Sequence, residues 1–327
     1  MADEPRQSKS KRHHWWPKAH SRYWGENGRV TRVVVNENGI ETVDDNTPAF
    51  TAVIENLNTA DRGTKDDVSF ENFLLKYDTN ASKILTSFRD FVDERKSTEL
   101  KFNVRKWIIR YLSSILFRVP SWRSLEAEGL DDDSAHKGVA NEYIESFGRM
   151  LEIMSEKLPG FDRQADFRQN WGIEAARDNI KYFSEGILAA SRIEFSEVPK
   201  GQSLLFSDAP YEWRRSPDNL KTIPSQLIMP LFPDWAIILQ TNINERQRYE
   251  LRFTGLEPEQ VTEINDGIIA RARREIFLKG QLSDDMRDHI QKIHHSQRPL
   301  SGRIRLAEGS ENLFKIPPFA MDPATFE

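Results

Sequence analysis

The 327-residue chain contains no cysteine. This absence excludes disulfides, thiolate nucleophiles, and zinc-finger and iron–sulfur sites, and it is typical of proteins of the reducing cytoplasm. Long apolar runs are also missing: the most apolar stretch, Leu227–Leu239, is interrupted by Pro230, Pro233 and Asp234, whereas a membrane-spanning helix needs about 20 apolar residues. The polar, basic N-terminus has no apolar core of the kind that secretory signals carry. We therefore expect a cytoplasmic protein with no membrane partner.

Four standard catalytic motifs are absent as well. The sequence has no G-x-x-x-x-G-K-[ST], no G-x-G-x-x-G after an apolar strand, no H-E-x-x-H and no G-x-S-x-G. These absences argue against a P-loop nucleotide hydrolase, a Rossmann cofactor site, a zincin metalloprotease and an α/β-hydrolase.

Charge is unevenly distributed along the chain. The net charge is -5, but residues 1–24 hold six Lys or Arg against two acidic residues, so that this segment carries +4 and the remainder -9. Three tryptophans lie in the same segment, and a basic stretch interleaved with aromatics is one way to bind a nucleic-acid strand. We favour the alternative that residues 1–11 form a disordered basic tail and that the aromatics after it anchor in the core. The acidic remainder argues against a non-specific DNA coat.

Apolar spacing predicts an α+β fold, with small sheet segments from both ends of the chain around a central helical insert. Helices are expected at residues 69–96, 103–118, 136–157, 173–191 and 257–278, with a short one within 280–299. Strands are expected at residues 29–35, 40–43, 192–197, 203–207, 227–229 and 235–240. Residues 12–300 are predicted to form one domain whose helical insert covers about 69–191. Residues 301–327 are predicted to form an extended C-terminal tail.

Five short segments stand out, and their order resembles a bacterial family of unknown function, DUF4238. They are His13–Trp24, Arg118–Arg123, Ser207–Pro210, Pro230–Pro233 and the helix around Asn265. The family opens with a His-x-x-Pro-x-x-Tyr-Leu-x-x-Phe-like segment, followed by Arg-x-Pro-x-x-Arg, Ser-Asp-x-Pro and Pro-Leu-x-Pro steps and a helix with an Asn. The resemblance covers about residues 13–279. The positions that match by motif are His14, Pro17, Trp24, Arg118, Arg123, Asp208, Pro210 and Asn265.

The sequence departs from the family pattern at two positions in the opening segment. His20 stands where the family suggests Tyr, and Ser21 where it suggests Leu. Any role that the family assigns to the tyrosine hydroxyl at this position is therefore not expected of His20. The resemblance brings no established activity, so the chemistry has to be argued from the side chains.

One interpretation is a nuclease-like enzyme that acts on a phosphodiester or a nucleotide. His14 would act as general acid or base, since a histidine titrates near neutrality. Arg118 and Arg123 would hold the phosphate and the developing charge, and Asp208 would orient His14 or bind Mg²⁺. This hypothesis requires the four side chains to meet in one cleft.

The alternative is a non-catalytic binding or sensor module in a bacterial stress or anti-phage system. His14 would then tie a loop to the sheet, the two arginines would pair with carboxylates, and Asp208 would cap a turn. Asn265 is expected to be a buried hydrogen-bonding bridge. Burial separates the two interpretations, because bracing side chains are paired and covered, whereas catalytic ones border a pocket that solvent reaches.

Overall fold

A computed structural model describes residues 12–36, 38–55, 60–61, 66–67, 69–95, 102–119, 180, 192–214, 226–240 and 251–295. The predicted tails, the predicted helix at 136–157 and all but Ile180 of the one at 173–191 lie outside these residues. Among the described residues, no helix is long and apolar enough to span a membrane.

The larger sheet has five strands in the order β12-β7-β11-β10-β9. Their bounds are Leu251–Gly255 (β12), Arg192–Glu197 (β7), Trp235–Gln240 (β11), Gln226–Phe232 (β10) and Glu212–Arg214 (β9). β12 runs parallel to β7, and the other pairs are antiparallel. The tight β10–β11 hairpin turns at Pro233 and Asp234. Both faces of this hairpin are buried, which explains its continuous apolar sequence.

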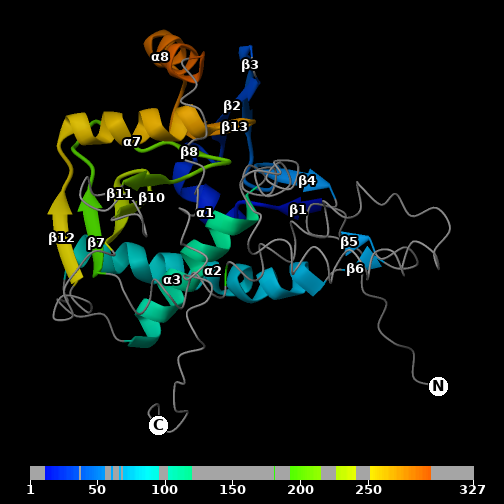
Figure 1. The fold of residues 1–327 in the computed structure, drawn as a ribbon, viewed down its shortest axis with the longest axis vertical. Coiled ribbons are helices and arrows are strands. Elements are labelled where there is room, and N and C mark those ends of the chain that lie inside the picture. The colour runs from blue at the N-terminus through cyan, green and yellow to red at the C-terminus, as the bar shows by residue number, and fades with distance from the viewer. Residues whose placement is uncertain are drawn as a thin grey trace, which may run out of the picture.

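Helices cover the two faces of this sheet (Figure 1). α2 (Ser69–Glu94) and α3 (Phe102–Arg118) lie on one side, and α7 (Pro258–Arg271) crosses the other. Alternation along the strands divides the core accordingly: Ile237 and Leu239 belong to the cluster with α2 and α3, whereas Ala236 and Ile238 belong to the cluster with α7. The sheet is thus the middle layer of three.

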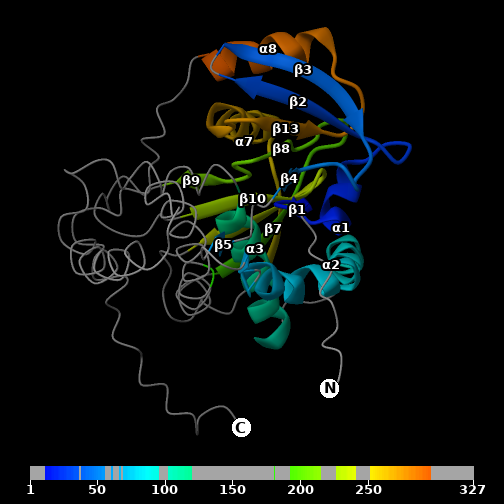
Figure 2. The same cartoon turned by 90° about the vertical axis from the view of Figure 1, so that its right-hand side faces the viewer.

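The second sheet joins the two ends of the chain, as the sequence predicts. Its order is β3-β2-β13-β8, with bounds Gly39–Asn46 (β3), Val30–Asn36 (β2), Glu275–Leu278 (β13) and Phe206–Ser207 (β8). β13 therefore lies between the N-terminal hairpin and β8. α8 (Asp284–His295) packs beside β3 and α7 (Figure 2). The α+β class, with sheet from both ends around central helices, is confirmed.

Smaller elements complete the N-terminal part. β1 (Arg12–His14) pairs with β4 (Val53–Glu55), and β5 (Ala60–Asp61) pairs with β6 (Asp66–Asp67). α1 (Lys18–Ser21) continues into η1 (Arg22–Trp24), a short 3-10 helix.

The predicted helix at 257–278 is wrong in its last third. α7 ends at Arg271, Ala272 takes an extended conformation (ψ 131°), and Glu275–Leu278 is a strand. Helical spacing of apolar residues continues to Ile276. As a strand, however, β13 forms backbone hydrogen bonds with β2 and β8, and a helix at this place would leave the facing backbone groups of those strands unpaired. The predicted strand ranges do not include β1, β4, β5, β6, β9, β12 or β13.

The N-terminal aromatics are core residues. Trp15, Trp16 and Trp24 are completely buried. The Trp16 ring stacks on Phe206 with centroids 4.0 Å apart and planes 9° apart, and this aromatic packing links the segment before β2 to the second sheet. These rings are therefore not available to stack on nucleic-acid bases.

We predict that Gly39→Ala destabilises the protein by about 1 kcal/mol more than Gly28→Ala. Both glycines have positive φ (108° and 77°), which L side chains rarely adopt. A Cβ at Gly39 would also meet the side chain of Gln291, which accepts a hydrogen bond from Ile40 N (2.8 Å), whereas a Cβ at Gly28 has open space. Urea unfolding of the two variants measures the difference. Equal losses would contradict the assigned Gly39–Gln291 packing.

Candidate functional site

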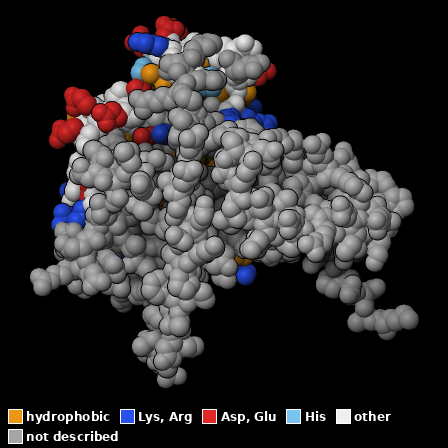
Figure 3. Space-filling model, in the orientation of Figure 1, with side chains coloured by type: hydrophobic (Ala, Val, Ile, Leu, Met, Phe, Trp, Pro, Cys, Tyr) orange, Lys and Arg blue, Asp and Glu red, His pale blue; other side chains and the backbone are white. Residues whose placement is uncertain are grey.

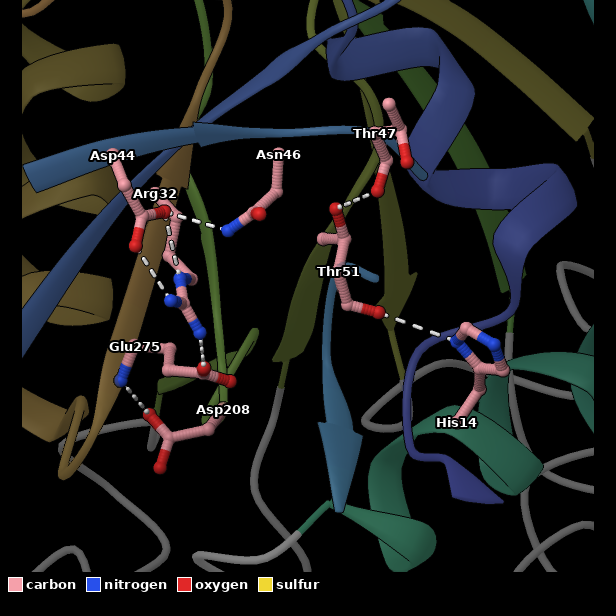
Figure 4. Close-up of polar contacts among 8 residues, drawn as sticks. All are labelled: His14, Arg32, Asp44, Asn46, Thr47, Thr51, Asp208 and Glu275. Atoms are coloured by element: carbon pink, nitrogen blue, oxygen red, sulfur yellow. Dashed lines mark hydrogen bonds and ion pairs between the residues drawn. The ribbon is translucent and has the colours of Figure 1, made fainter. Parts of the chain in front are cut away.

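His14 lies at the end of β1 with one ring nitrogen anchored. Its Nδ1 donates to the carbonyl oxygen of Thr51 at 3.2 Å (Figure 4). This bond places the proton on Nδ1 and leaves Nε2 as the lone-pair nitrogen, and Nε2 has no hydrogen bond to the described residues. Burial lowers the pKa of His14, although the Thr51 carbonyl and Asp78 act in the opposite direction. His14 is therefore a neutral, half-buried imidazole at pH 7.

Arg118, at the end of α3, is completely buried and paired. Its guanidinium donates to both carboxylate oxygens of Asp78 on α2, at 2.8 and 3.1 Å. Burial opposes its charge, but Asp78 more than compensates, so the pKa of Arg118 is raised. The same guanidinium lowers the pKa of His14 electrostatically. Arg118 thus acts on His14 through its charge, and Asp78 on α2 is the compensating charge.

Two further buried polar side chains adjoin this pair. His20 Nε2 donates to Leu231 O at 2.7 Å, and burial lowers the pKa of His20 to about 4. Its ring lies 5.9 Å from that of Tyr111, whose pKa is raised by burial. The Tyr111 hydroxyl and the Arg118 Nε have no hydrogen-bond partner among the described residues. His20 is thus a neutral core histidine at the position where the family pattern suggests a phenol.

Sequence reasoning missed Asp78, although a signal was present. Leu74 and Ala81 are buried core positions of α2, and Asp78 lies four residues after the first and three before the second. That spacing places a carboxylate on the apolar face of the helix. A charge there needs a partner, and Arg118 supplies it.

Asp208 lies elsewhere, after β8. It is completely buried, and its Oδ1 accepts hydrogen bonds from the backbone N–H of Arg273 (3.1 Å) and Glu275 (3.5 Å). Burial raises its pKa to about 6. Its neighbours are the ion-paired Arg32 and Glu275, and no hydrogen bond links this group to the one around His14 and Thr51 (Figure 4). Asp208 fixes the turn between α7 and β13.

Two predicted residues remain, Arg123 and Asn265. Arg123 lies outside the described residues. Asn265 is the predicted bridge: its Oδ1 accepts from Leu205 N and its Nδ2 donates to Ser203 O, both at 2.9 Å. In the described part of the chain, no group of three or more His, Asp or Glu side chains is placed to hold a metal ion.

Two of the cavities on the described residues are lined by neither His14, Arg118 nor Asp208. One, of about 360 Å³, is lined by Lys18, Arg22, Gly25, Gly28, Thr47, Pro48 and Ala49. The other, of about 300 Å³, lies between the five-stranded sheet and α7. The first is connected to His14 through one loop, because Thr51 donates to Thr47 O at 2.9 Å and holds the imidazole with its own carbonyl.

The sequence matches the family described as "Protein of unknown function (DUF4238)" over residues 12–281. The chain belongs to the DUF4238 family. No curated protein and no solved structure matches the chain. Membership in DUF4238 fixes no activity, so the function has to be inferred from the side chains of this chain. In space, the DUF4238-like motifs fall into at least two groups, one with His14 and Arg118 and the other with Asp208.

We predict that Asp208→Asn removes a pH dependence of stability. Because the folded pKa of Asp208 lies near 6, above its ordinary 3.8, the folded protein binds this proton more tightly than the unfolded chain. Its contribution to the free energy of unfolding therefore falls as pH rises from about 4 to 6. The variant should gain about 1–3 kcal/mol relative to the wild type between pH 4 and 7.

Urea unfolding of both proteins at several pH values measures this gain. A difference between variant and wild type that stays constant from pH 4 to 7 would contradict the assigned burial of a titrating carboxyl.

Proposed function

We propose that this DUF4238 protein is a non-catalytic binding module in which Arg118 and Asp208 brace the fold. The observation that carries the proposal is their complete burial together with their pairing. A phosphate-binding arginine must present its N–H groups to the ligand. Arg118 instead directs two nitrogens at Asp78.

Asp208 supports the same interpretation. A catalytic carboxylate needs access to substrate or metal, whereas Asp208 accepts backbone N–H groups at the junction of α7 and β13. Such bonds satisfy donors that a helix-to-strand change leaves open. Its role is to fix the backbone between the end of α7 and the start of β13.

Surface charge favours a small ligand over a polyanionic strand on one face. In Figure 3, acidic side chains gather over the end of α7 near β12 and around α8. The exposed acidic residues there include Glu257, Glu259, Glu263, Asp284 and Asp285. Like charge repels nucleic-acid phosphates. A place in a stress or anti-phage system stays a prediction.

We predict that Arg118→Gln lowers the free energy of unfolding by about 3 kcal/mol, because it leaves the Asp78 charge without its buried partner. The matched control is Arg89→Gln. Arg89 also makes a two-point contact, with Asp234, but there the side chains are 31% and 46% exposed. Solvent screening limits the control's loss to about 1 kcal/mol. Urea unfolding measures both, and an Arg118 variant as stable as the control would contradict the bracing role.

A second candidate function is phosphodiester or nucleotide hydrolysis at His14. The imidazole supports it, because it is neutral, its Nδ1 is anchored, and its Nε2 has no hydrogen bond to the described residues, as suits a general base. The loop that anchors it also lines the cavity with Lys18 and Arg22, whose charges suit a phosphate. Arg118 would then act on His14 only through its charge.

The two functions differ in turnover. Under the proposed binding function, the full chain does not hydrolyse bis-p-nitrophenyl phosphate, single-stranded DNA, RNA or nucleoside triphosphates, with or without added Mg²⁺. Hydrolysis that His14→Ala abolishes, while Arg89→Gln retains it, would overturn the binding module in favour of the second candidate. His14→Ala is expected to remain folded, because the histidine is half-buried and makes one hydrogen bond.

A further inference from the structure

α7 begins beside β12 and crosses the five-stranded sheet (Figure 1). The cavity of about 300 Å³ is lined by residues of this sheet and of the first turns of α7. Its lining includes the polar side chains Glu194, Ser196, Gln226, Gln240, Thr254 and Gln260. Apolar walls come from Ile228, Ile238, Leu256 and Ile264. Its volume is at the lower end of the range for small-molecule sites.

The polar lining is unusual for a central strand. β7 has neighbours on both sides, and strand alternation puts Arg192, Glu194 and Ser196 on the face toward α7. On the opposite face, Ile193 and Phe195 are completely buried in the core. Covered faces of central strands are normally apolar. Polar groups on this face, beside a cavity, therefore point to a ligand.

Hydrogen bonds between neighbouring strands orient these groups. Glu194 accepts from Thr254 Oγ1 at 2.9 Å and from Gln240 Nε2 at 3.3 Å. Ser196 and Thr254 share a hydrogen bond of 2.7 Å, and Arg192 donates to the Gln240 oxygen. Ser196 Oγ also lies 3.5 Å from Glu194 Oε1. The carboxylate is held in place, and its Oε2, which accepts from Gln240, can accept a further donor.

Two carboxamides extend this polar surface. Gln226 is the register partner of Gln240, so both side chains lie on the cavity face. The carboxamide of Gln226 has no hydrogen bond to the described residues. Gln260, exposed at the mouth, uses its oxygen to accept from Glu257 N at 2.8 Å, which leaves its N–H groups as donors.

Charge around the cavity favours an uncharged ligand. Glu194 is the one ionisable residue in the described lining. Arg192, two residues earlier on β7, forms an ion pair with Glu194 at 3.9 Å, so that one positive charge balances the negative one. A ligand with donors and acceptors but no net charge uses this balance without displacing an ion pair.

We propose that this cavity binds a small, planar, uncharged heterocycle with N–H donors and carbonyl or ring-nitrogen acceptors, the class to which nucleobases and nucleosides belong. Carboxamides and carboxylates are the side chains that pair with base edges. The isoleucines and Leu256 take the ring faces. The inference rests on the proposed binding function, for which it names the pocket and the ligand class.

Isothermal titration calorimetry on the full chain tests the proposal. The probes are adenosine, guanosine, cytidine and uridine, with ribose and inorganic phosphate as comparisons. We expect at least one nucleoside to bind and neither comparison compound to do so. Glu194→Gln and Gln226→Ala should each weaken binding about tenfold or more, whereas Glu41→Gln, at an exposed position of β3, should leave it unchanged.

Gln226→Ala keeps the test sound if Glu194→Gln fails to fold, because Gln226 is half-buried and its carboxamide makes no hydrogen bond to the described residues. The absence of binding by any nucleoside at millimolar concentration would overturn the inference, as would binding that both variants retain. Neither result would contradict the bracing role of Arg118 and Asp208. Hydrolysis that depends on His14 would instead contradict the proposed non-catalytic function, and the calorimetry would still decide the proposal for this cavity.

Discussion

Two long-range hydrogen bonds from a short aromatic segment fix the arrangement of the whole molecule. His20 donates to Leu231 and Trp24 donates to Leu204, partners 211 and 180 residues further along the chain. Both bonds are buried, and Trp16 packs against the two donor side chains and stacks on Phe206. A buried donor whose acceptor is lost costs its full desolvation. The N-terminal segment therefore has one favourable position, and from it the N-terminal hairpin reaches β13.

The spacing of apolar residues along the sequence predicted those helices and strands that depend on residues only a few positions apart. α2, α3, β7 and β11 follow from apolar spacing, and they agree with the predicted ranges to within two residues at each end. β13 could not be predicted in this way, because Ile276 continues the helical spacing of α7. Its strand conformation comes from pairing with Val33 and Ser207, which lie far away in the sequence. Tertiary pairing overrides local propensity there.

The sequence likewise identified some residues of the candidate site and missed others. The sequence predicted that His14 and Arg118 share one site, and in the structure the guanidinium of Arg118 lowers the pKa of His14. The carboxylate that pairs with Arg118, Asp78, was recognisable in the sequence only as a charge on the apolar face of α2. Asp208 was expected in the same cleft. It lies instead with the backbone of residues 273–275, because β8 pairs with β13 and not with β1. The motifs that resemble the family along the sequence therefore lie at separate places in the fold.

The buried positions of His20 and Asp208 have a joint consequence for the response to acid. Between pH 6.5 and about 4, the unfolded chain protonates a histidine that the folded core keeps neutral, so His20 makes acid destabilising. Over nearly the same range, Asp208 takes up its proton more readily in the folded state, so it makes acid stabilising. The two contributions oppose each other. Together, the opposed protonation of His20 and Asp208 makes the free energy of unfolding depend less on pH on the acid side of neutrality.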